Sequence, residues 1–301
     1  MAAQDQPGAP LWERDYSDPM GQGWGVAVGA ADSVWLTGRT IGLGDLFVLH
    51  YTSAGALLHA DAFDFEGKLD RGWAVTTDAN GRAYVAGMVT GAMLSDERLV
   101  IRAYNDNNTV VYSKVGPVPF VTHGLGIDVA ANGDLLVAGT WKKDGDQDLW
   151  VGRLTAAAAP LWSYNEGDFA YTDTANAIVA AADGSIYAAG AIKGGKTDAW
   201  LRKHSGAGAH LWTHVHSNPA QISEHAHGVA IDSKGDVVIV GVDDGNAWIR
   251  KLSPAGEVQW TEVHDDAAWA AAYAVAIDAE DHIWVAGQRK GTQIWVARLA
   301  P

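Results

Sequence analysis

The sequence predicts an all-β fold, a six-bladed β-propeller whose blades are four-stranded antiparallel sheets. A short β-branched or aromatic run that ends in glycine recurs six times along the 301 residues, and the closing glycines are separated by 49, 52, 51, 51 and 46 residues: Gly38, Gly87, Gly139, Gly190, Gly241 and Gly287. A fixed period of this size indicates a repeat architecture. Each unit contains four strand-like runs separated by turn residues, and helical periodicity is absent, as in a small antiparallel sheet.

The fourth unit shows the elements of one blade in order. Its expected strands are residues 175–181, 184–190, 198–204 and 209–215, with the first strand innermost. Aligning the other units on it predicts a single domain, with blades at about residues 22–64, 71–117, 123–167, 174–218, 225–266 and 271–301.

The last unit stops after its third strand, and the N-terminus carries a candidate for the missing one. Gly8-Ala-Pro-Leu-Trp12 nearly repeats Ala158-Ala-Pro-Leu-Trp162, which lies in the fourth strand of the third unit. We therefore expect residues 8–15 to complete the last blade, which closes the ring and protects its sheet edges.

Large aromatic side chains recur at fixed places in the units. The third strands carry Phe47, Trp150, Trp200, Trp248 and Trp295, and the fourth strands carry Tyr112, Trp162, Trp212 and Trp260. Such flat side chains fill the space between neighbouring blades, so we assign them to packing. The third strands also repeat a basic residue, which we expect to pair with carboxylates between blades: Arg102, Arg153, Arg202, Arg250 and Arg298.

Composition excludes several classes of function. The chain has no cysteine and a formal net charge of −15. Disulfides, thiolate metal sites and cysteine nucleophiles are therefore excluded, and binding to nucleic acid is disfavoured. No apolar run of membrane-spanning length occurs, so we expect no membrane insertion. We also expect the protein to be a monomer. No signal peptide is visible, which leaves a cytoplasmic location, or a secreted or periplasmic one if a signal has been removed.

The repeat resembles two related groups of bacterial propellers. The units share a pattern that reads Asp78-Ala-Asn-Gly-Arg-Ala-Tyr-Val-Ala-Gly87 in the second unit. In other units a third strand such as Asp198-Ala-Trp200 and a turn before Trp212 follow it, and together these features look like the SBBP repeats. They are also similar to the Trp-docked blades of pyrroloquinoline-quinone (PQQ) dehydrogenases and their non-catalytic relatives. The resemblance extends from about residue 8 to 301 and implies the fold. The quinoprotein enzymes usually have eight blades and a vicinal cysteine pair, so a chain with six blades and no cysteine is not expected to bind PQQ.

Two adjacent positions on the inner strands behave differently across the six units. The first is always small: Gly23, Gly72, Gly124, Ala175, Ala226 and Ala272. The second differs in every unit apart from one repeated tryptophan: Trp24, Trp73, Leu125, Asn176, His227 and Tyr273. Because a varied position serves no shared structural need, we predict that the second set lines a ligand funnel at one face, a location inferred by analogy with other propellers. The alternative is plain packing at the rim. Nearby segments add Arg39, Asp70, Arg71, Trp141 and Trp269.

A histidine pair is the main candidate for metal binding. In an extended strand His225 and His227 project to the same side, where they could bridge a divalent cation, and Glu224 faces the other way. His123 or Asp173 could complete the ligand shell. The alternative, which the absence of a stronger metal-binding motif favours, is that these histidines are simply polar caps on a loop.

Two further patterns are weaker candidates. His214 and His216 lie on an outer strand, which we expect to face solvent. Asp144-Gly-Asp-Gln-Asp148 alternates carboxylates as calcium loops do, but Leu149 and Thr155 replace the expected glycine and glutamate.

These observations leave three functions open. The first is recognition of a small cyclic, aromatic or glycan-like ligand, or of a protein loop, in the funnel. The second is a metal-assisted hydrolase or lyase in which a bound water is activated, with catalytic candidates His225, His227, Glu224, His123 and Asp173. Six-bladed lactonases and phosphotriesterases host such sites by analogy, mainly with carboxylate and amide ligands, which Asp70, Asp173, Asn176 and Glu224 match loosely. The third is a structural scaffold, and whether the protein is an enzyme stays open.

Overall fold

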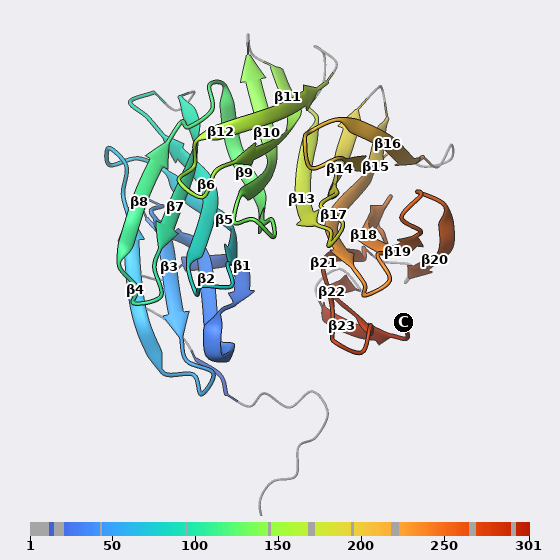
Figure 1. Ribbon diagram of the computed structural model, residues 1–301, viewed down its shortest axis with the longest axis horizontal. Helices are drawn as coiled ribbons and strands as arrows, with labels where there is room; N and C mark the ends of the chain where they lie inside the picture. The colour runs from blue at the N-terminus through green and yellow to red at the C-terminus, as the bar shows by residue number, and fades with distance from the viewer. Residues whose placement is uncertain are drawn as a thin grey trace, which may run out of the picture.

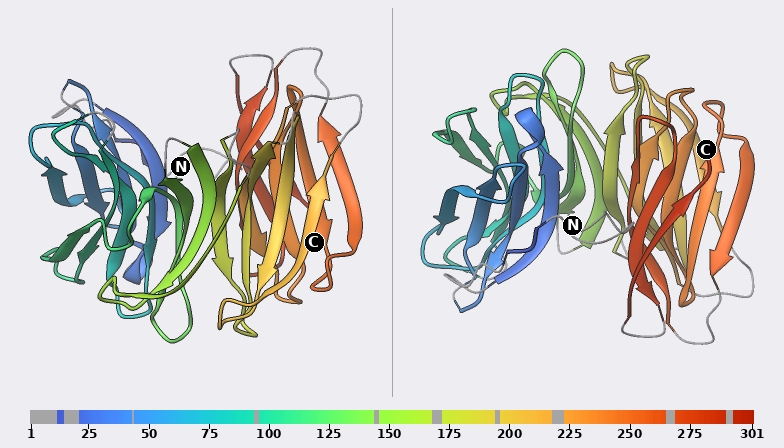
Figure 2. Two further views of the ribbon diagram at one scale, coloured as in Figure 1. Left: turned by 90° about the horizontal axis from the view of Figure 1, so that it is seen from above. Right: turned by 90° about the horizontal axis from the view of Figure 1, so that it is seen from below.

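The computed structural model describes residues 12–14, 21–42, 44–93, 96–143, 146–167, 172–193, 196–217, 223–264, 269–289 and 293–301. They form six antiparallel sheets that follow one another around a central axis, which confirms the predicted all-β propeller of six blades (Figure 1). The blades stand side by side in chain order, with their strands running between the two faces of the molecule (Figure 2). Within the described ranges the only helix is a single 3₁₀ turn at Ala30–Asp32.

Within each blade the strands are arranged in chain order, so that the first strand lies nearest the axis and the last lies at the outside. Blade one consists of β1 (Gly21–Val28), β2 (Val34–Thr40), β3 (Leu46–Tyr51) and β4 (Leu57–Phe63). Blade two consists of β5 (Asp70–Thr77), β6 (Ala83–Thr90), β7 (Glu97–Tyr104) and β8 (Val110–Val115). Blade three consists of β9 (Val121–Val129), β10 (Leu135–Lys143), β11 (Asp146–Leu154) and β12 (Pro160–Glu166).

The remaining blades repeat this order. Blade four consists of β13 (Thr174–Ala180), β14 (Ile186–Lys193), β15 (Thr197–His204) and β16 (His210–His216). Blade five consists of β17 (Glu224–Ile231), β18 (Val237–Asp243), β19 (Asn246–Leu252) and β20 (Val258–His264). Blade six has three strands among the described residues, β21 (Ala271–Ile277), β22 (Ile283–Arg289) and β23 (Gln293–Leu299).

The core lies between neighbouring blades rather than inside any one of them. Leu136 and Leu149 of blade three, for example, pack in one cluster with Ile178 and Trp200 of blade four. The middle strands β3, β6 and β18 are buried along their whole length, whereas outer strands such as β12 alternate between exposed and half-buried residues. The sequence shows this difference directly, because runs buried on both faces are continuously apolar and half-exposed runs alternate.

The second strand of each blade ends its repeated run in glycine because the backbone of the inner strand passes very close to that position. A Cβ atom at Gly87 would lie 1.9 Å from the carbonyl oxygen of Arg71, and one at Gly190 would lie 1.9 Å from that of Thr174. Any side chain at these positions would push the inner strand away from the second strand, which explains why each unit ends its second run in glycine.

The aromatic side chains of the outer strands fasten each blade to the next. The indole of Trp162 donates a hydrogen bond to the carbonyl oxygen of Gly206, and that of Trp212 to Pro254, in the turn between the third and fourth strands of the following blade. Trp12 makes the same kind of contact with blade one, where its indole donates to the carbonyl oxygen of Ser53 at 2.8 Å. The position of Trp12 is thus the one expected for an outer-strand aromatic of a blade that precedes blade one.

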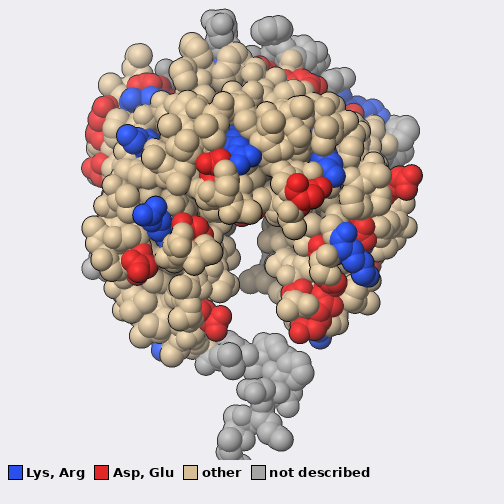
Figure 3. Space-filling model, viewed as in Figure 1, with Lys and Arg blue, Asp and Glu red and all other residues tan. Residues whose placement is uncertain are grey.

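Among the described residues, the ring is open between blade one and blade six (Figure 3). A Cβ atom at Gly23 would meet nothing within 4 Å, whereas at the equivalent Gly72 it would lie 1.9 Å from Thr37 of the preceding blade. Apolar side chains line both sides of the opening, with Ile294 of β23 91% exposed and Val26 of β1 also exposed. The predicted fourth strand of blade six, residues 8–15, falls mostly on residues outside the described ranges, so closure of the ring stays a prediction.

Amide hydrogen exchange tests this closure. If residues 8–15 pair with β23, the outward N–H groups of β23 are hydrogen-bonded and exchange slowly, and deletion of residues 1–11 makes them exchange faster. The outer strand β16 is an edge in either case and serves as the control. Fast exchange along β23 in the full chain would contradict the predicted closure.

Candidate functional site

Every inner strand contains a β-bulge at the same place. The pairing with the second strand skips one residue in each blade, between positions such as Gly72 and Ala74 or Ala226 and Gly228. The skipped residues are Trp24, Trp73, Leu125, Asn176, His227 and Tyr273. A bulge leaves its extra residue outside the hydrogen-bond ladder and redirects its side chain. These six residues are the varied positions that the sequence predicted as a funnel lining.

The six bulge residues meet around the axis and line one cavity of about 320 Å³. Small residues of the inner strands, such as Gly25, Ala74, Gly126 and Ala177, form the wall between them. The small residues that directly precede the bulge residues allow neighbouring blades to approach each other closely. A Cβ atom at Gly124, for example, would lie 2.9 Å from Ala86 of blade two. The cavity thus receives one side chain from each blade.

One side of the cavity is a stacked tryptophan pair. The rings of Trp24 and Trp73 lie 4.3 Å apart and are inclined by 23°. The guanidinium of Arg39 lies 5.6 Å from the ring centre of Trp24, and that of Arg71 lies 5.4 Å from the ring centre of Trp73. Burial and the nearby charge of Arg39 lower the pKa of Arg71. This wall therefore combines two aromatic faces with two neighbouring cations, an arrangement stabilised by cation–π attraction.

The other side of the cavity is polar. The side-chain amide of Asn176 donates a hydrogen bond to the carbonyl oxygen of Ala226 at 2.8 Å, which fixes its orientation. The rings of His227 and Tyr273 lie 5.3 Å apart. Burial, with a further contribution from His225, lowers the pKa of His227 to about 4, so this imidazole is neutral at physiological pH.

The two histidines proposed for metal binding lie side by side on β17. Their rings are parallel, with an interplanar angle of 1° and centres 5.9 Å apart, which agrees with the expected projection to one side. The side chain of His225 lies 3.2 Å from the hydroxyl of Ser223. Among the described residues neither His225 nor His227 belongs to a cluster of three or more close ligating groups. Metal binding by this pair stays a prediction.

The structure does not bring the other expected ligands to this pair. His123 lies 2.8 Å from the hydroxyl of Thr140 and 3.7 Å from the carboxylate of Glu97. Asp173 accepts a hydrogen bond from the backbone N–H of Lys193.

Five of the predicted funnel residues lie outside the cavity lining: Arg39 and Arg71, which flank the two tryptophans, and Asp70, Trp141 and Trp269. Asp70 is buried and accepts a hydrogen bond from the backbone N–H of Phe65, and burial raises its pKa to about 7. Trp141 packs edge-on against Phe120, and Trp269 is half exposed beside Gly245. The aromatic part of the cavity consists of Trp24, Trp73 and Tyr273.

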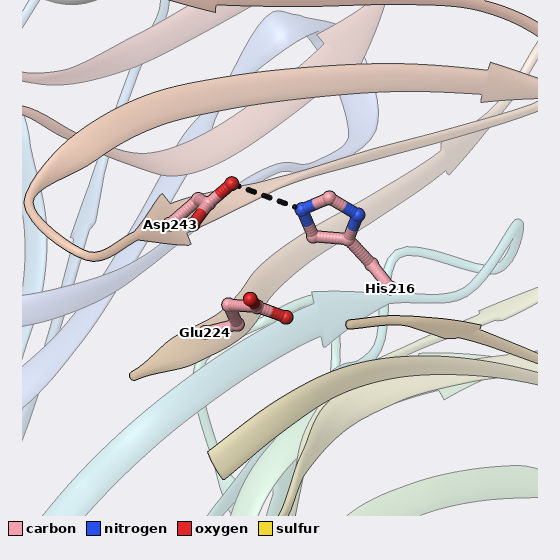
Figure 4. Close-up of side chains that lie close together, drawn as sticks. All are labelled: His216, Glu224 and Asp243. Carbon is pink, nitrogen blue, oxygen red and sulfur yellow. Dashed lines mark hydrogen bonds and ion pairs between the residues drawn. The ribbon is translucent and has the colours of Figure 1, made fainter. Parts of the chain in front are cut away.

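The expectation that His216 faces solvent is wrong. Its side chain is only 14% exposed, and its ring lies 4.8 Å from that of Trp248 in the following blade. The reason is that alternate side chains of an outer strand point back toward the next blade. His216 also lies beside Asp243 and Glu224, a group that sequence reasoning missed (Figure 4). The alternating carboxylates at residues 144–148 include positions outside the described residues.

The third-strand arginines follow the predicted pairing only in part. Arg102 reaches Asp61 of blade one at 2.5 Å and Arg202 reaches Glu166 of blade three at 2.9 Å, so pairing between blades is confirmed for these two. Arg153 pairs with Asp134 of its own blade, so the prediction is wrong there. Arg250 contacts His214 of blade four at 2.9 Å instead of a carboxylate.

Charged side chains of both signs are interspersed on the face drawn in Figure 3. Within the described ranges, no helix is both long and apolar enough to cross a membrane.

Comparisons with known proteins bear on the fold. No family model matches the chain, and no curated protein matches its sequence. Solved structures do match over nearly all of it. A gluconolactonase from Xanthomonas campestris aligns with a TM-score of 0.54 and 15% identity, over 94% of this chain and 88% of that one. An α-L-arabinofuranosidase from Fusarium graminearum aligns with a TM-score of 0.59 and 11% identity, over 96% and 95%.

A third match is a binding protein. Sqt1 from Chaetomium thermophilum, bound to the N-terminus of a ribosomal protein, aligns with a TM-score of 0.52 and 12% identity, over 90% of this chain and 84% of that one. At such identities the likeness concerns the fold alone. The chain therefore shares the β-propeller fold with a gluconolactonase, an α-L-arabinofuranosidase and Sqt1, and its assignment to the SBBP or PQQ-like repeat type stays a prediction.

Proposed function

We propose that the protein recognises a small cyclic, aromatic or glycan-like ligand in the axial cavity. One observation carries the proposal: six bulge residues, one from each blade, line a single cavity of about 320 Å³ with aromatic faces on one side and polar groups on the other. Concave, mostly apolar sites with a few oriented polar groups are typical of small-ligand binding.

The two walls suit different parts of such a ligand. A sugar ring or an aromatic ring can lie against the Trp24–Trp73 pair, and ring hydroxyls can exchange hydrogen bonds with Asn176, His227 and Tyr273. Arg39 and Arg71 beside the tryptophans favour a ligand that also carries an acidic group, because two nearby cations attract a carboxylate strongly in a partly buried site.

The comparisons are compatible with this proposal but do not decide it. Two of the similar folds belong to enzymes named for sugar-derived substrates, and a third is bound to a peptide. The small volume of the cavity favours a compact ligand over a protein loop.

The metal-assisted hydrolase is the second candidate for the same cavity. It is supported by the parallel imidazoles of His225 and His227, whose pKa values are both lowered by burial, so that their nitrogens are available as neutral ligands. It needs a third ligand beside this pair, and the described residues place none there. Recognition without catalysis is therefore the function that the geometry supports better.

We expect the tryptophan pair to dominate the binding affinity. Trp24→Ala and Trp73→Ala should each weaken binding by about tenfold or more, since an aromatic stacking contact contributes roughly 1 kcal/mol beyond the area it buries. The measurement is isothermal titration calorimetry, after a screen of monosaccharides, their acid forms and aromatic metabolites by ligand-observed NMR. Trp269→Ala is the matched control, because Trp269 lies outside the cavity lining.

Variants of the polar wall test which groups of a ligand the cavity recognises. Asn176→Ala and His227→Ala should weaken binding of hydroxyl-bearing rings, and Arg71→Gln should selectively weaken binding of the acid forms. If ligands bind and neither tryptophan variant changes their affinity, the cavity is not the binding site. Hydrolysis of a ligand that is lost in His227→Ala would instead support the hydrolase.

A further inference from the structure

A second polar cluster lies away from the axial cavity, in the interface between blades four and five. His216 ends β16, Glu224 begins β17 and Asp243 ends β18, where it is paired in register with Glu224. Nε2 of His216 lies 3.2 Å from Oδ2 of Asp243, and the ligating atoms of the three residues all lie within 4.8 Å of one another. The imidazole and the two carboxylates approach one another from three strands, as Figure 4 shows.

Both carboxylates of this cluster are buried. Glu224 is 1% exposed and Asp243 is 7% exposed. Oδ1 of Asp243 is buried and has no hydrogen-bond partner among the described residues. Two buried carboxylates side by side are unfavourable, because both lose their hydration and repel each other, unless a cation compensates them.

Arg250 lies beside the cluster in the same interface. Its positive charge acts on both carboxylates, and its guanidinium donates hydrogen bonds to His214 and Thr261. His216 adds an imidazole nitrogen, 3.2 Å from Asp243, to the two carboxylates. An imidazole nitrogen with carboxylate oxygens is a donor set that suits a zinc ion.

The repeat provides an internal comparison for each of the three positions. In blade four the equivalent of Glu224 is Asp173, which accepts the backbone N–H of Lys193, and the equivalent of Asp243 is Ile192. The second carboxylate is thus not part of the ordinary blade.

The next interface, between blades five and six, keeps the histidine without the equivalents of Glu224 and Asp243, and His264 instead lies 3.1 Å from Glu262 of its own strand. His264 packs against Trp295 at 4.8 Å, the same separation as between His216 and Trp248. Ala270 and Arg289 occupy the positions equivalent to the two carboxylates. The histidine therefore has a packing role in both interfaces, whereas the two carboxylates are specific to one of them.

We propose that His216, Glu224 and Asp243 bind one divalent transition-metal ion, Zn²⁺ by preference, which links blade four to blade five. One imidazole nitrogen with carboxylate oxygens suits Zn²⁺, while Ca²⁺ and Mg²⁺ prefer oxygen ligands alone. Ligand atoms at about 2.0–2.2 Å from a tetrahedral zinc lie roughly 3.4 Å apart, close to the separation of His216 and Asp243. The ligand atom of Glu224 lies within 4.8 Å of the other two, so a side-chain rotation of Glu224 toward them would complete the three protein ligands, with the fourth position left for water.

The test is zinc binding by the full chain after dialysis against a chelator. Isothermal titration with ZnCl₂, together with metal analysis after gel filtration, should show one Zn²⁺ per chain. Zinc at 100 times its dissociation constant should also raise the free energy of unfolding by about 2.7 kcal/mol. Ca²⁺ under the same conditions should bind much more weakly.

Near-isosteric variants assign the ligands. Asp243→Asn and Glu224→Gln should each weaken zinc binding by about tenfold or more, because removing even a group that only supports a ligand costs about 10–100-fold in metal affinity. Thermal melts of the metal-free proteins show whether the variants fold. His264→Ala should bind zinc like the unmodified protein, since it removes the equivalent histidine in an interface that has Ala270 and Arg289 in place of the two carboxylates. The double variant His225→Ala/His227→Ala should also keep the zinc.

Three results would overturn this assignment. The first is the absence of stoichiometric zinc in the unmodified protein, which decides the matter even if a variant fails to fold. The second is unchanged affinity in Asp243→Asn and Glu224→Gln. The third is loss of zinc in His225→Ala/His227→Ala alone, which would move the metal to the axial cavity.

Discussion

Replacing Trp200 with alanine is expected to lower the free energy of unfolding by about 3–5 kcal/mol, the range for removing a large aromatic side chain from a core. Trp200 lies on β15 of blade four and is fully buried against Leu136, Leu149 and other side chains of blade three. A Cβ atom at Gly190 would lie 2.9 Å from its ring, so the surrounding backbone is already in close contact. The cavity left by alanine would separate the two blades, and urea denaturation measures the loss.

Two variants give this prediction its controls. Trp200→Phe should cost clearly less than the alanine variant, because it keeps most of the ring and removes a buried indole N–H that has no hydrogen-bond partner among the described residues. Trp269→Ala should change stability by no more than about 1 kcal/mol, since Trp269 is half exposed. If Trp200→Ala proved as mild as Trp269→Ala, packing between blades would not be the main source of stability.

Replacing Asp61 with alanine is expected to cost about 3–5 kcal/mol, because it leaves a buried guanidinium without its carboxylate. Arg102 of blade two reaches across to Asp61 of blade one at 2.5 Å, and Tyr104 also donates a hydrogen bond to Asp61 at 2.7 Å. The exposed pair Arg98–Asp96 is the control, where Asp96→Ala should change stability by less than about 1 kcal/mol.

The stabilisation that Asp61 provides should decrease as the pH falls. Burial alone would raise the pKa of Asp61, but hydrogen bonds from Tyr104 and Arg102 outweigh it and lower the net pKa. A carboxyl whose pKa is lowered by folding stabilises the protein above its unfolded pKa of about 3.9, and this contribution is lost as the pH falls through the folded value. The stability difference between the unmodified protein and Asp61→Ala should therefore be full at pH 7 and shrink toward pH 3. A double variant with Arg102→Met should recover part of the loss, and a loss that does not depend on Arg102 would contradict the role given to this ion pair.

The sequence predicted the blades because the features that build them are local. The closing glycines, the turn residues and the aromatic side chains of the third strands each act within one unit, so their period is visible without a structure. The positions of Trp24, Trp73 and His227 were predicted for a related reason, since a site that varies while its neighbour stays small is recognisable by aligning the units.

Contacts between units were harder to predict. That His216 faces Asp243 depends on how far blade four is rotated against blade five, and nothing within either unit records this angle. The bulges were missed because an extra residue in one strand shows only against the register of its partner. Trp141 was placed at the cavity from its position after Gly139, but its contact with Phe120 depends on the path of a loop.

The repeated bulge also affects which residues of this protein can be substituted without disturbing the fold. A residue that takes no part in the hydrogen-bond ladder can be exchanged without altering strand register, and each blade contributes one such residue to the axis. Six positions can therefore vary while the strand register and the architecture are inherited unchanged. A library of substitutions at Trp24, Trp73, Leu125, Asn176, His227 and Tyr273 would make this propeller a scaffold for selecting new binding specificities.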